Sequence, residues 1–167
     1  MADLTDDAAR FAYLAEGNAK QARKRVAADV LLRDELNKIL LVNPTYKDYW
    51  DLPGGMVENN ESPRQAVVRE LGEELGVDVV PGRVLAVDWI SAHGPWDDQL
   101  AFIFDGGILD SARIKRIRVV DAEISEFMFA DYSEAVNRLR PDMAERLQRA
   151  MESLGGSEFP YSETEVR

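Results

Sequence analysis

Residues 55–77 read GMVENNESPRQAVVRELGEELGV, and this stretch predicts one capped helix. Ser62 stands at the N-cap, Pro63 follows as the first helical residue, and Gln65 completes an S-x-x-Q capping box. Gly76 stands where a helix ends in a left-handed residue. Between these signals, apolar residues recur every four positions and form a stripe that we expect to be buried, at Val67, Leu71 and Leu75.

An acidic cluster lies on another face of the same helix, at Glu70, Glu73 and Glu74. Like charges three or four positions apart repel by about 0.2–0.5 kcal/mol per pair, and the C-terminal end of a helix also disfavours anions. A hard cation such as Mg²⁺ removes both penalties, because it takes oxygen ligands and reaches phosphates through one or two carboxylates. A solvated acidic face, which is the usual explanation of a charge run, does not require the surrounding cap and glycines. The cluster therefore predicts a metal site.

The same residues resemble the Nudix box, G-x5-E-x7-R-E-U-x-E-E-x-G-U, in which U is an aliphatic residue. The fixed positions are all matched, by Gly55, Glu61, Arg69, Glu70, Leu71, Glu73, Glu74, Gly76 and Val77. The preceding residues 50–54, WDLPG, also resemble the usual lead-in to that box. The resemblance implies an α/β (α+β) fold of the Nudix type, which is an α/β/α sandwich with a mixed β-sheet.

For the site, the resemblance implies a division of roles. The expected metal ligands are the carboxylates of Glu70, Glu73 and Glu74 and the backbone carbonyl of Gly54. Arg69 is expected to orient a box glutamate through a charge-assisted hydrogen bond. Glu61 and Gly55 are expected to support the loop, and a plain salt bridge between Arg69 and Glu61 is compatible with that role.

Hydrolysis of a phosphoanhydride needs an in-line water, neutralised phosphoryl oxygens and a base that takes the proton of the water. Glu70 is the first candidate for the base. Some members of the family place the base on a later glutamate, and Glu126 lies where that residue would fall, with Glu123 as a nearby competitor. Glu126 as a simple polar residue beside a strand is an equal alternative.

The resemblance implies a Nudix hydrolase that cleaves the pyrophosphate bond of a nucleoside diphosphate linked to another moiety. Mg²⁺ is the expected cofactor, and Mn²⁺ is expected to substitute. Candidate substrates are nucleoside triphosphates, ADP-ribose, nucleotide sugars and dinucleoside polyphosphates, with a MutT-like triphosphate pyrophosphohydrolase as one specificity. The alternative is a Nudix-fold sensor or scaffold that binds a nucleotide without turnover, although such proteins usually have a degraded box.

Length and composition bound the remaining possibilities. A chain of 167 residues with 46% hydrophobic and 31% charged residues suits one soluble domain. The net charge of −11 disfavours a duplex nucleic-acid partner, and no apolar run approaches the ~20 residues of a membrane helix. Without cysteine and with one histidine, His93, only oxygen-rich metal sites remain. Because the first residues lack a secretory signal, we expect a cytoplasmic location. A monomer and a homodimer are both left open.

The chain divides into three expected parts: an N-terminal helical extension over 1–23, a Nudix domain over 24–154 and a mobile tail over 155–167. The extension starts a helix near Thr5 and ends it near Gly17. It is expected to pack on its own domain, and pairing with a second subunit is the less favoured alternative. The expected strands are 26–32, 38–42, 84–90, 100–104 and 125–130, followed by helices that start at Asp131 and Pro141.

Substrate recognition is expected outside the box. The loop 91–98 holds His93 and Trp96, which can stack on or hydrogen-bond to a base or sugar. Trp50 can line the pocket, although a place in the core is the favoured reading. The substrate phosphates have several candidate partners, which the spacing does not separate: Arg25, Arg33, Lys47 and Arg113. Gly72, inside the expected helix, costs about 1 kcal/mol relative to alanine, and close approach of a neighbouring segment would account for it.

Overall fold

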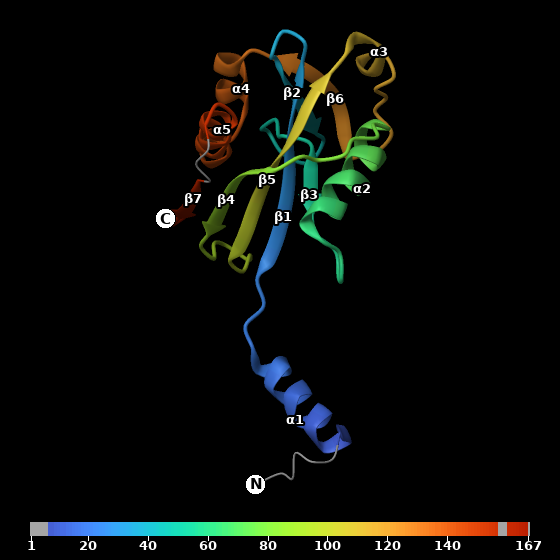
Figure 1. Ribbon diagram of the computed structural model, residues 1–167. Helices are drawn as coiled ribbons and strands as arrows, with labels where there is room; N and C mark the ends of the chain where they lie inside the picture. Colours follow the sequence, from blue (N-terminus) through green and yellow to red (C-terminus); the bar gives the residue numbers. More distant parts are fainter. Residues whose placement is uncertain (1–6, 157–159, 167) are drawn as a thin grey trace.

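A mixed β-sheet forms the centre of the molecule and helices cover both of its faces (Figure 1). The computed structural model describes residues 7–156 and 160–166. In chain order the elements are α1 (Asp7–Lys20), β1 (Arg25–Asp34), β2 (Ile39–Pro44), β3 (Gly54–Met56), α2 (Pro63–Leu75), β4 (Val84–Ile90), β5 (Gln99–Leu109), α3 (Ser111–Ile114), β6 (Ile124–Ala130), α4 (Tyr132–Arg138), α5 (Pro141–Leu154) and β7 (Tyr161–Thr164).

The seven strands of the described residues follow the order β6-β2-β1-β5-β4-β7, and β3 pairs with β1 beside this row. β1 and β5 run parallel, as do β4 and β7, whereas the other pairs are antiparallel. The expected hairpin between β1 and β2 is confirmed, with Arg33 opposite Ile39. The strands expected near 84–90 and 125–130 are confirmed as β4 and β6.

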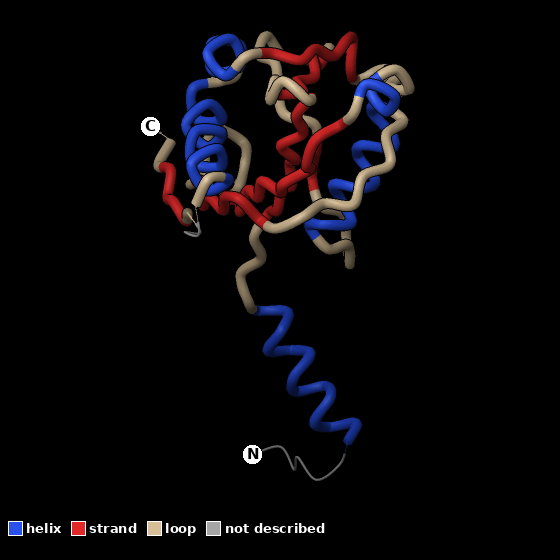
Figure 2. The backbone as a smooth tube through the Cα atoms, turned by 45° about the horizontal axis from the view of Figure 1, so that its top comes forward, coloured by secondary structure: helices blue, strands red, loops and turns tan. Residues whose placement is uncertain are grey.

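The two faces of the sheet carry separate cores, as alternation along β1 shows. Val30 and Leu32 belong to a cluster with the buried side of α2, while Leu31 belongs to a cluster with α4 and α5. Figure 2 shows these helices on opposite sides of the strands. The expected α/β/α sandwich is therefore confirmed. Among the described residues, none of the helices combines the length and the apolar character that a membrane span requires.

One strand is longer than expected. We expected the strand starting at Leu100 to end at Asp105-Gly106-Gly107, but β5 continues to Leu109. Leu31 pairs with Asp105 and Leu32 with Gly107, so Gly106 is the extra residue of a β-bulge. The glycines permit the bulge and do not end the strand: Gly107 has φ 74°, and a Cβ at Gly106 would lie 2.6 Å from the side chain of Leu32.

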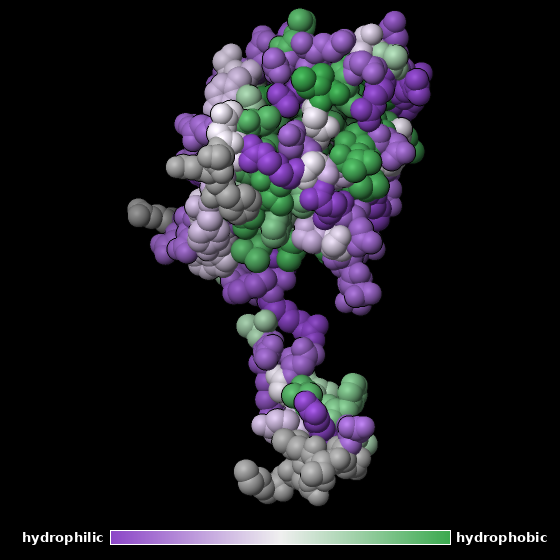
Figure 3. All heavy atoms as spheres, viewed as in Figure 1, coloured by the Kyte–Doolittle hydropathy of each residue, from purple (hydrophilic) through white to green (hydrophobic). Residues whose placement is uncertain are grey.

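The N-terminal helix departs from two expectations. α1 runs through Gly17 to Lys20, while Thr5 lies outside the described residues. None of the residues of α1 is buried, and the helix projects away from the sheet (Figure 1), so the expected packing on its own domain is wrong. Residues 21–24, which form neither helix nor strand, separate it from β1. Apolar side chains stay exposed on this helix (Figure 3), among them Phe11 and Leu14.

The tail also differs from its prediction. Gly155 caps α5 as expected, but Tyr161–Thr164 form β7 and extend the sheet beside β4. The expectation of mobility is therefore wrong for this strand. Its short alternation of exposed and half-buried residues lacks the apolar run that marks the other strands. The expected mobility of 157–159 and of Arg167 lies outside the described residues.

Candidate functional site

The helix α2 begins and ends with the capping residues that the sequence predicted. The hydroxyl of Ser62 accepts a hydrogen bond from the backbone N–H of Gln65 (3.2 Å), and the side chain of Gln65 accepts one from the N–H of Ser62 (2.9 Å). Gly76 ends the helix in the left-handed region, at φ 62°. The predicted apolar stripe is fully buried. This frame fixes the face of the helix that carries the glutamates.

Arg69 is the centre of the polar contacts on that face. Its Nε and Nη2 atoms lie 2.9 and 3.0 Å from the two carboxylate oxygens of Glu61, which makes a bidentate pair. Its Nη1 atom donates to Glu70 at 2.9 Å and to Glu73 at 3.0 Å. A further bond, from Nη2 to the carbonyl oxygen of Met56, ties the guanidinium to β3. One cation thus joins the loop, the helix and the neighbouring strand.

Two of the box glutamates are withdrawn from water. Glu74 is 9% exposed, and burial, together with the charge of Glu70, raises its pKa to about 8. One of its oxygens accepts a hydrogen bond from the N–H of Gly54 at 3.3 Å. Burial also raises the pKa of Glu70, against the opposing hydrogen bond from Arg69. Burial and mutual repulsion therefore disfavour the charged forms of both carboxyls unless a cation is bound.

Two further carboxylates belong to this site and were missed by the sequence analysis. Asp29 on β1 is 8% exposed, and burial, followed by the charge of Asp51, raises its pKa to about 8. The charge of Glu70 also reaches Asp29. Asp51 pairs with Lys47 at the rim. A charged residue inside an otherwise apolar strand was the available signal for Asp29, since buried carboxylates are rare without a partner.

The two glycines before the helix allow the strand and the helix to meet. A Cβ at Gly54 would lie 2.3 Å from the carbonyl oxygen of Ala28, and its φ of 143° is strained for other residues. A Cβ at Gly55 would lie 2.3 Å from a carboxylate oxygen of Glu70. Any larger residue at position 55 would therefore occupy the place of that carboxylate.

The chemistry of these donors fits a hard divalent cation, since the carboxylates are close, oxygen-bearing and partly desolvated. As the side chains lie, no three acidic or histidine side chains in the described part of the chain gather round one point. Arg69 holds two of these carboxylates, Glu70 and Glu73, through hydrogen bonds. Glu73 is more than half exposed and can turn toward a cation without displacing the core.

The later glutamates lie on and beside β6. The charge of Glu123 is the smallest of the influences that raise the pKa of Glu70. Glu126 accepts a hydrogen bond from the side chain of Asn43 on β2, at 3.2 Å.

A cavity of about 470 Å³ opens between the first turn of α5, the loop after β4 and the end of β7. His93 lines it, and its Nδ1 lies 2.9 Å from the carbonyl oxygen of Ser91. Arg140 and Asp142 line it from α5, where Arg140 Nη2 donates to Asp142 at 2.8 Å. The sequence analysis missed Arg140 as a site residue. It lies at the N-cap of the helix, a position that carries no signal for an arginine.

The cavity adjoins the acidic cluster through Arg140. The pKa of Arg140 is raised by its hydrogen bond to Asp142 and further by the charges of Asp51 and Asp29. Arg140 also lines a smaller cavity of about 110 Å³ together with Lys47, Asp51 and Trp50. Trp50 itself packs against the core cluster of α4 and α5 and also lines this smaller cavity.

The other expected recognition residues lie elsewhere. Trp96 is 54% exposed and stacks under the guanidinium of Arg25, 4.7 Å from its ring centre, and it does not line the large cavity. Arg33 pairs with Asp105, and Arg113 donates to the carbonyl oxygen of Asp78. Of the four candidate phosphate partners, Lys47 pairs with Asp51, one of the two further carboxylates of the site.

Comparisons with known proteins match this architecture. A family model described as the NUDIX domain matches residues 23–154. An RNA pyrophosphohydrolase of Nitratiruptor sp. is 27% identical over 127 residues, which cover 69% of this chain and 81% of that protein. An 8-oxo-dGTP diphosphatase of Proteus vulgaris is 41% identical over 58 residues, or 32% of this chain and 51% of that protein. The chain spans 24% to 51% of the length of the first four curated relatives that it matches.

Solved structures show the same fold. The MutT protein of Methanosarcina mazei Go1 superposes with a TM-score of 0.68 at 23% identity, over 81% of this chain and 100% of that chain. A UDP-X diphosphatase superposes with a TM-score of 0.69 at 22% identity, over 94% of this chain and 75% of that chain.

Proposed function

This chain belongs to the NUDIX domain family of pyrophosphohydrolases, and from that premise we propose that it hydrolyses a nucleoside diphosphate linked to another moiety. The bond cleaved is the pyrophosphate bond. Mg²⁺ is the proposed cofactor, and Mn²⁺ is proposed to substitute for it. The observation that carries the proposal is the acidic cluster on α2, in which Glu74 is buried and Arg69 holds Glu70 and Glu73 through hydrogen bonds.

The proposed ligands are the carboxylates of Glu70, Glu73 and Glu74 and the backbone carbonyl of Gly54. A bound divalent cation supplies neutralisation of charge on the phosphoryl oxygens. Arg69 positions Glu70 and Glu73 through the hydrogen bonds described above. Asp51 adds negative charge near these ligands, since its charge raises the pKa of both Asp29 and Glu74.

Glu70 is the proposed general base. Its carboxylate is half-buried, and a pKa above the ordinary value strengthens it as a proton acceptor near neutral pH. It would take the proton of the attacking water. Glu126 is the alternative base, with Glu123 as its nearby competitor.

The large cavity is the proposed site for the nucleoside. Its volume of about 470 Å³ lies in the range of small-molecule sites. Ile90, Pro141 and Val166 give it apolar walls. Its one arginine, Arg140, is already paired with Asp142, and Glu145 and Glu165 add two more carboxylates. This lining repels additional phosphates and offers acceptors for the N–H groups of a base or the hydroxyls of a sugar.

A nucleotide-binding sensor without turnover is the rival proposal. It predicts that a nucleotide binds and is recovered unchanged. The intact set of box glutamates and the positioned Arg69 favour catalysis, because binding alone does not require a braced acidic cluster.

The deciding experiment incubates the full chain with a panel of nucleoside triphosphates, ADP-ribose, nucleotide sugars and dinucleoside polyphosphates, with and without Mg²⁺. Products are identified by mass, so that the bond cleaved is also learned. Metal-dependent release of a nucleoside monophosphate or diphosphate from any member supports the hydrolase. Binding across the panel without turnover would favour the sensor.

A further inference from the structure

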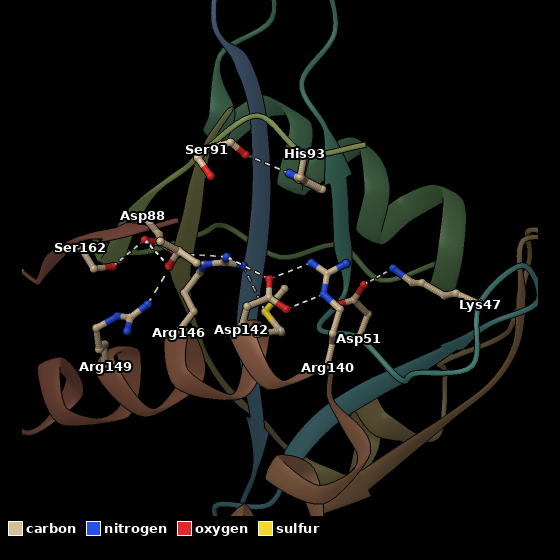
Figure 4. A network of polar contacts seen from close by, with 12 residues as sticks. Lys47, Asp51, Asp88, Ser91, His93, Arg140, Asp142, Arg146, Arg149 and Ser162 are labelled. Carbon is tan, nitrogen blue, oxygen red and sulfur yellow. Dashed lines mark hydrogen bonds and ion pairs between the residues drawn. The ribbon is translucent and has the colours of Figure 1, made fainter. Parts of the chain in front are cut away.

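A buried carboxylate behind the large cavity holds the C-terminal strand in place. Asp88, on β4, is 0% exposed and lies opposite Ser162 in the parallel pairing with β7. Its Oδ1 atom accepts a hydrogen bond from the hydroxyl of Ser162 at 2.8 Å, and its Oδ2 atom accepts one from the hydroxyl of Thr164 at 3.0 Å. Both hydroxyls come from the half-buried side of β7. Figure 4 shows the contact between Ser162 and Asp88.

The same carboxylate holds α5. Nε and Nη2 of Arg146 lie 3.2 and 3.1 Å from Asp88 Oδ2, and Arg146 is itself only 2% exposed. Arg149, one turn further along the helix, adds an ion pair at 3.5 Å (Figure 4). A charge removed from water this completely is stable only when it is paired and hydrogen-bonded on both oxygens. Asp88 therefore requires both β7 and α5 to stay where they are.

These two elements form facing walls of the large cavity. Asp142 lines it from the first turn of α5 and Arg140 from the N-cap of that helix, while Thr164 lines it from the end of β7 and Val166 from just beyond that strand. Neither Asp88 nor Ser162 lines the cavity. Two hydrogen bonds to Ser91, in the loop after β4, also fix the position of the C-terminal wall. The N–H of Ser91 donates to the carbonyl oxygen of Thr164, and the N–H of Val166 donates to the hydroxyl of Ser91.

We propose that β7 is a specificity wall of the substrate cavity and that Asp88 is its positioning residue, which sets the gap between β7 and α5 by binding Ser162 and Arg146. The proposal rests on the proposed function, because it takes the occupant of the cavity to be the nucleoside part of the substrate. Asp88 touches no substrate in this arrangement. It acts through the two walls, so its loss changes binding of the nucleoside and leaves the chemistry at α2 intact.

Ser162→Ala is the decisive variant, because it removes one bond to Asp88 without changing any residue that lines the cavity. The expected result is a rise in KM of three- to tenfold for the preferred nucleotide, with kcat within twofold of the parent. Ser162→Thr keeps the hydroxyl and is expected to restore KM. Glu163→Ala is the matched control, since Glu163 lies on the exposed side of the same strand, and it is expected to leave KM unchanged.

An unchanged KM in Ser162→Ala, with the parent active, would overturn the proposal. So would a rise in KM that Ser162→Thr fails to reverse. Thermal midpoints of all variants separate this effect from general destabilisation, which lowers the midpoint without the split between KM and kcat.

A second measurement distinguishes failure of the proposed function from failure of the positioning role. Calorimetry without metal gives Kd values for AMP, GMP, CMP and UMP, and needs no turnover. If the parent hydrolyses no nucleotide, the proposed function fails, yet three- to tenfold weaker binding of a monophosphate to Ser162→Ala still supports the positioning role. Equal binding by Ser162→Ala and the parent, or binding of no monophosphate by the parent, overturns it.

Discussion

Gly55 and Glu70 meet so closely that a single methyl group would separate them. A Cβ at position 55 would lie 2.3 Å from one carboxylate oxygen of Glu70 and 2.6 Å from its carboxyl carbon. The nearest atoms belong to the carboxylate at the end of the flexible side chain of Glu70. This side chain can move without disturbing the fold, but its movement would disturb the site. The carboxylate of Glu70, on α2, therefore occupies the space where a side chain at position 55 of β3 would lie.

Gly55→Ala is expected to displace the carboxylate of Glu70 and to lower kcat/KM by about 100-fold, because misplacing a catalytic group by about 1 Å costs that much. Steady-state kinetics and a thermal melt test this together, and the melting midpoint is expected to change little. Gly54→Ala is the contrasting variant. Its Cβ would meet backbone atoms of Ala28 and Asp29 at a φ of 143°, so it should lower the midpoint as well. Parental activity in Gly55→Ala would show that Glu70 has no fixed place in the reaction.

Glu70→Gln is expected to lower kcat by at least about 100-fold while the fold stays intact, because a positioned general base contributes about 10²–10⁴-fold. Glu123→Gln and Glu126→Gln, measured beside it, identify the base. The variant with the largest fall in kcat, and with loss of the acidic limb of the pH–rate profile, carries the role. Near-normal turnover in Glu70→Gln would remove Glu70 from the mechanism.

The metal-free protein is expected to lose stability as the pH rises from about 5 to about 8. The pKa values of Glu74 and Asp29 are raised to about 8 by burial, from 4.5 and 3.8. Both carboxyls are thus protonated in the folded protein and ionised in the unfolded chain at neutral pH. Their contribution to the stability of the folded protein is fully present below the pKa values of the unfolded chain. It is lost as the pH rises through the pKa values of the folded protein. The thermal midpoint should fall by several degrees, since one pKa unit corresponds to about 1.4 kcal/mol.

Glu74→Gln is the variant that tests this cause, and it should flatten the dependence of the midpoint on pH. Glu73→Gln, at a side chain that is 54% exposed, is the control and should keep the dependence. Added Mg²⁺ should stabilise the parent more at pH 8 than at pH 6, because binding requires deprotonated carboxylates. A midpoint that rises over this range in the absence of metal would contradict the prediction.

Gly72→Ala is expected to stabilise the protein by about 1 kcal/mol, the difference in helix propensity between the two residues. A Cβ at this position meets nothing within 4 Å, so the close approach that the sequence suggested is absent here. Denaturant unfolding measures the gain. Gly76→Ala is the matched comparison, since its φ of 62° favours glycine, and it is expected to destabilise by about 1 kcal/mol.

Local signals predicted the parts of the molecule that are local. The cap of α2 at Ser62, its end at Gly76 and the turn between β1 and β2 each depend on residues within a few positions of one another. The acidic face of α2 follows from helical spacing alone. These features were therefore readable before any tertiary contact was known.

Features made by distant segments were not readable. Asp29 and Asp51 join the box glutamates because the sheet brings β1 beside β3, where Asp29 lies opposite Gly54. Arg140 reaches the same place from α5. The strand β7 escaped prediction because its stability comes from Asp88 on β4 and little from its own apolar content. Gly106 was misleading for another reason: a glycine can mark the end of a strand, but here it is the extra residue of a β-bulge within β5.

The parallel pairing of β1 with β5 has a consequence for how the chain assembles. Arg25 pairs with Gln99 and Asp34 with Leu109, so the middle of the sheet joins segments that are more than seventy positions apart. The hairpin of β1 and β2 leaves the ribosome long before β5 does. Until β5 is made, the edge of β1 that pairs with it has free hydrogen-bonding groups. Long-range pairings of this kind slow folding and prolong exposure to aggregation. A nascent chain that ends before residue 99 therefore lacks the strand that covers this edge of β1.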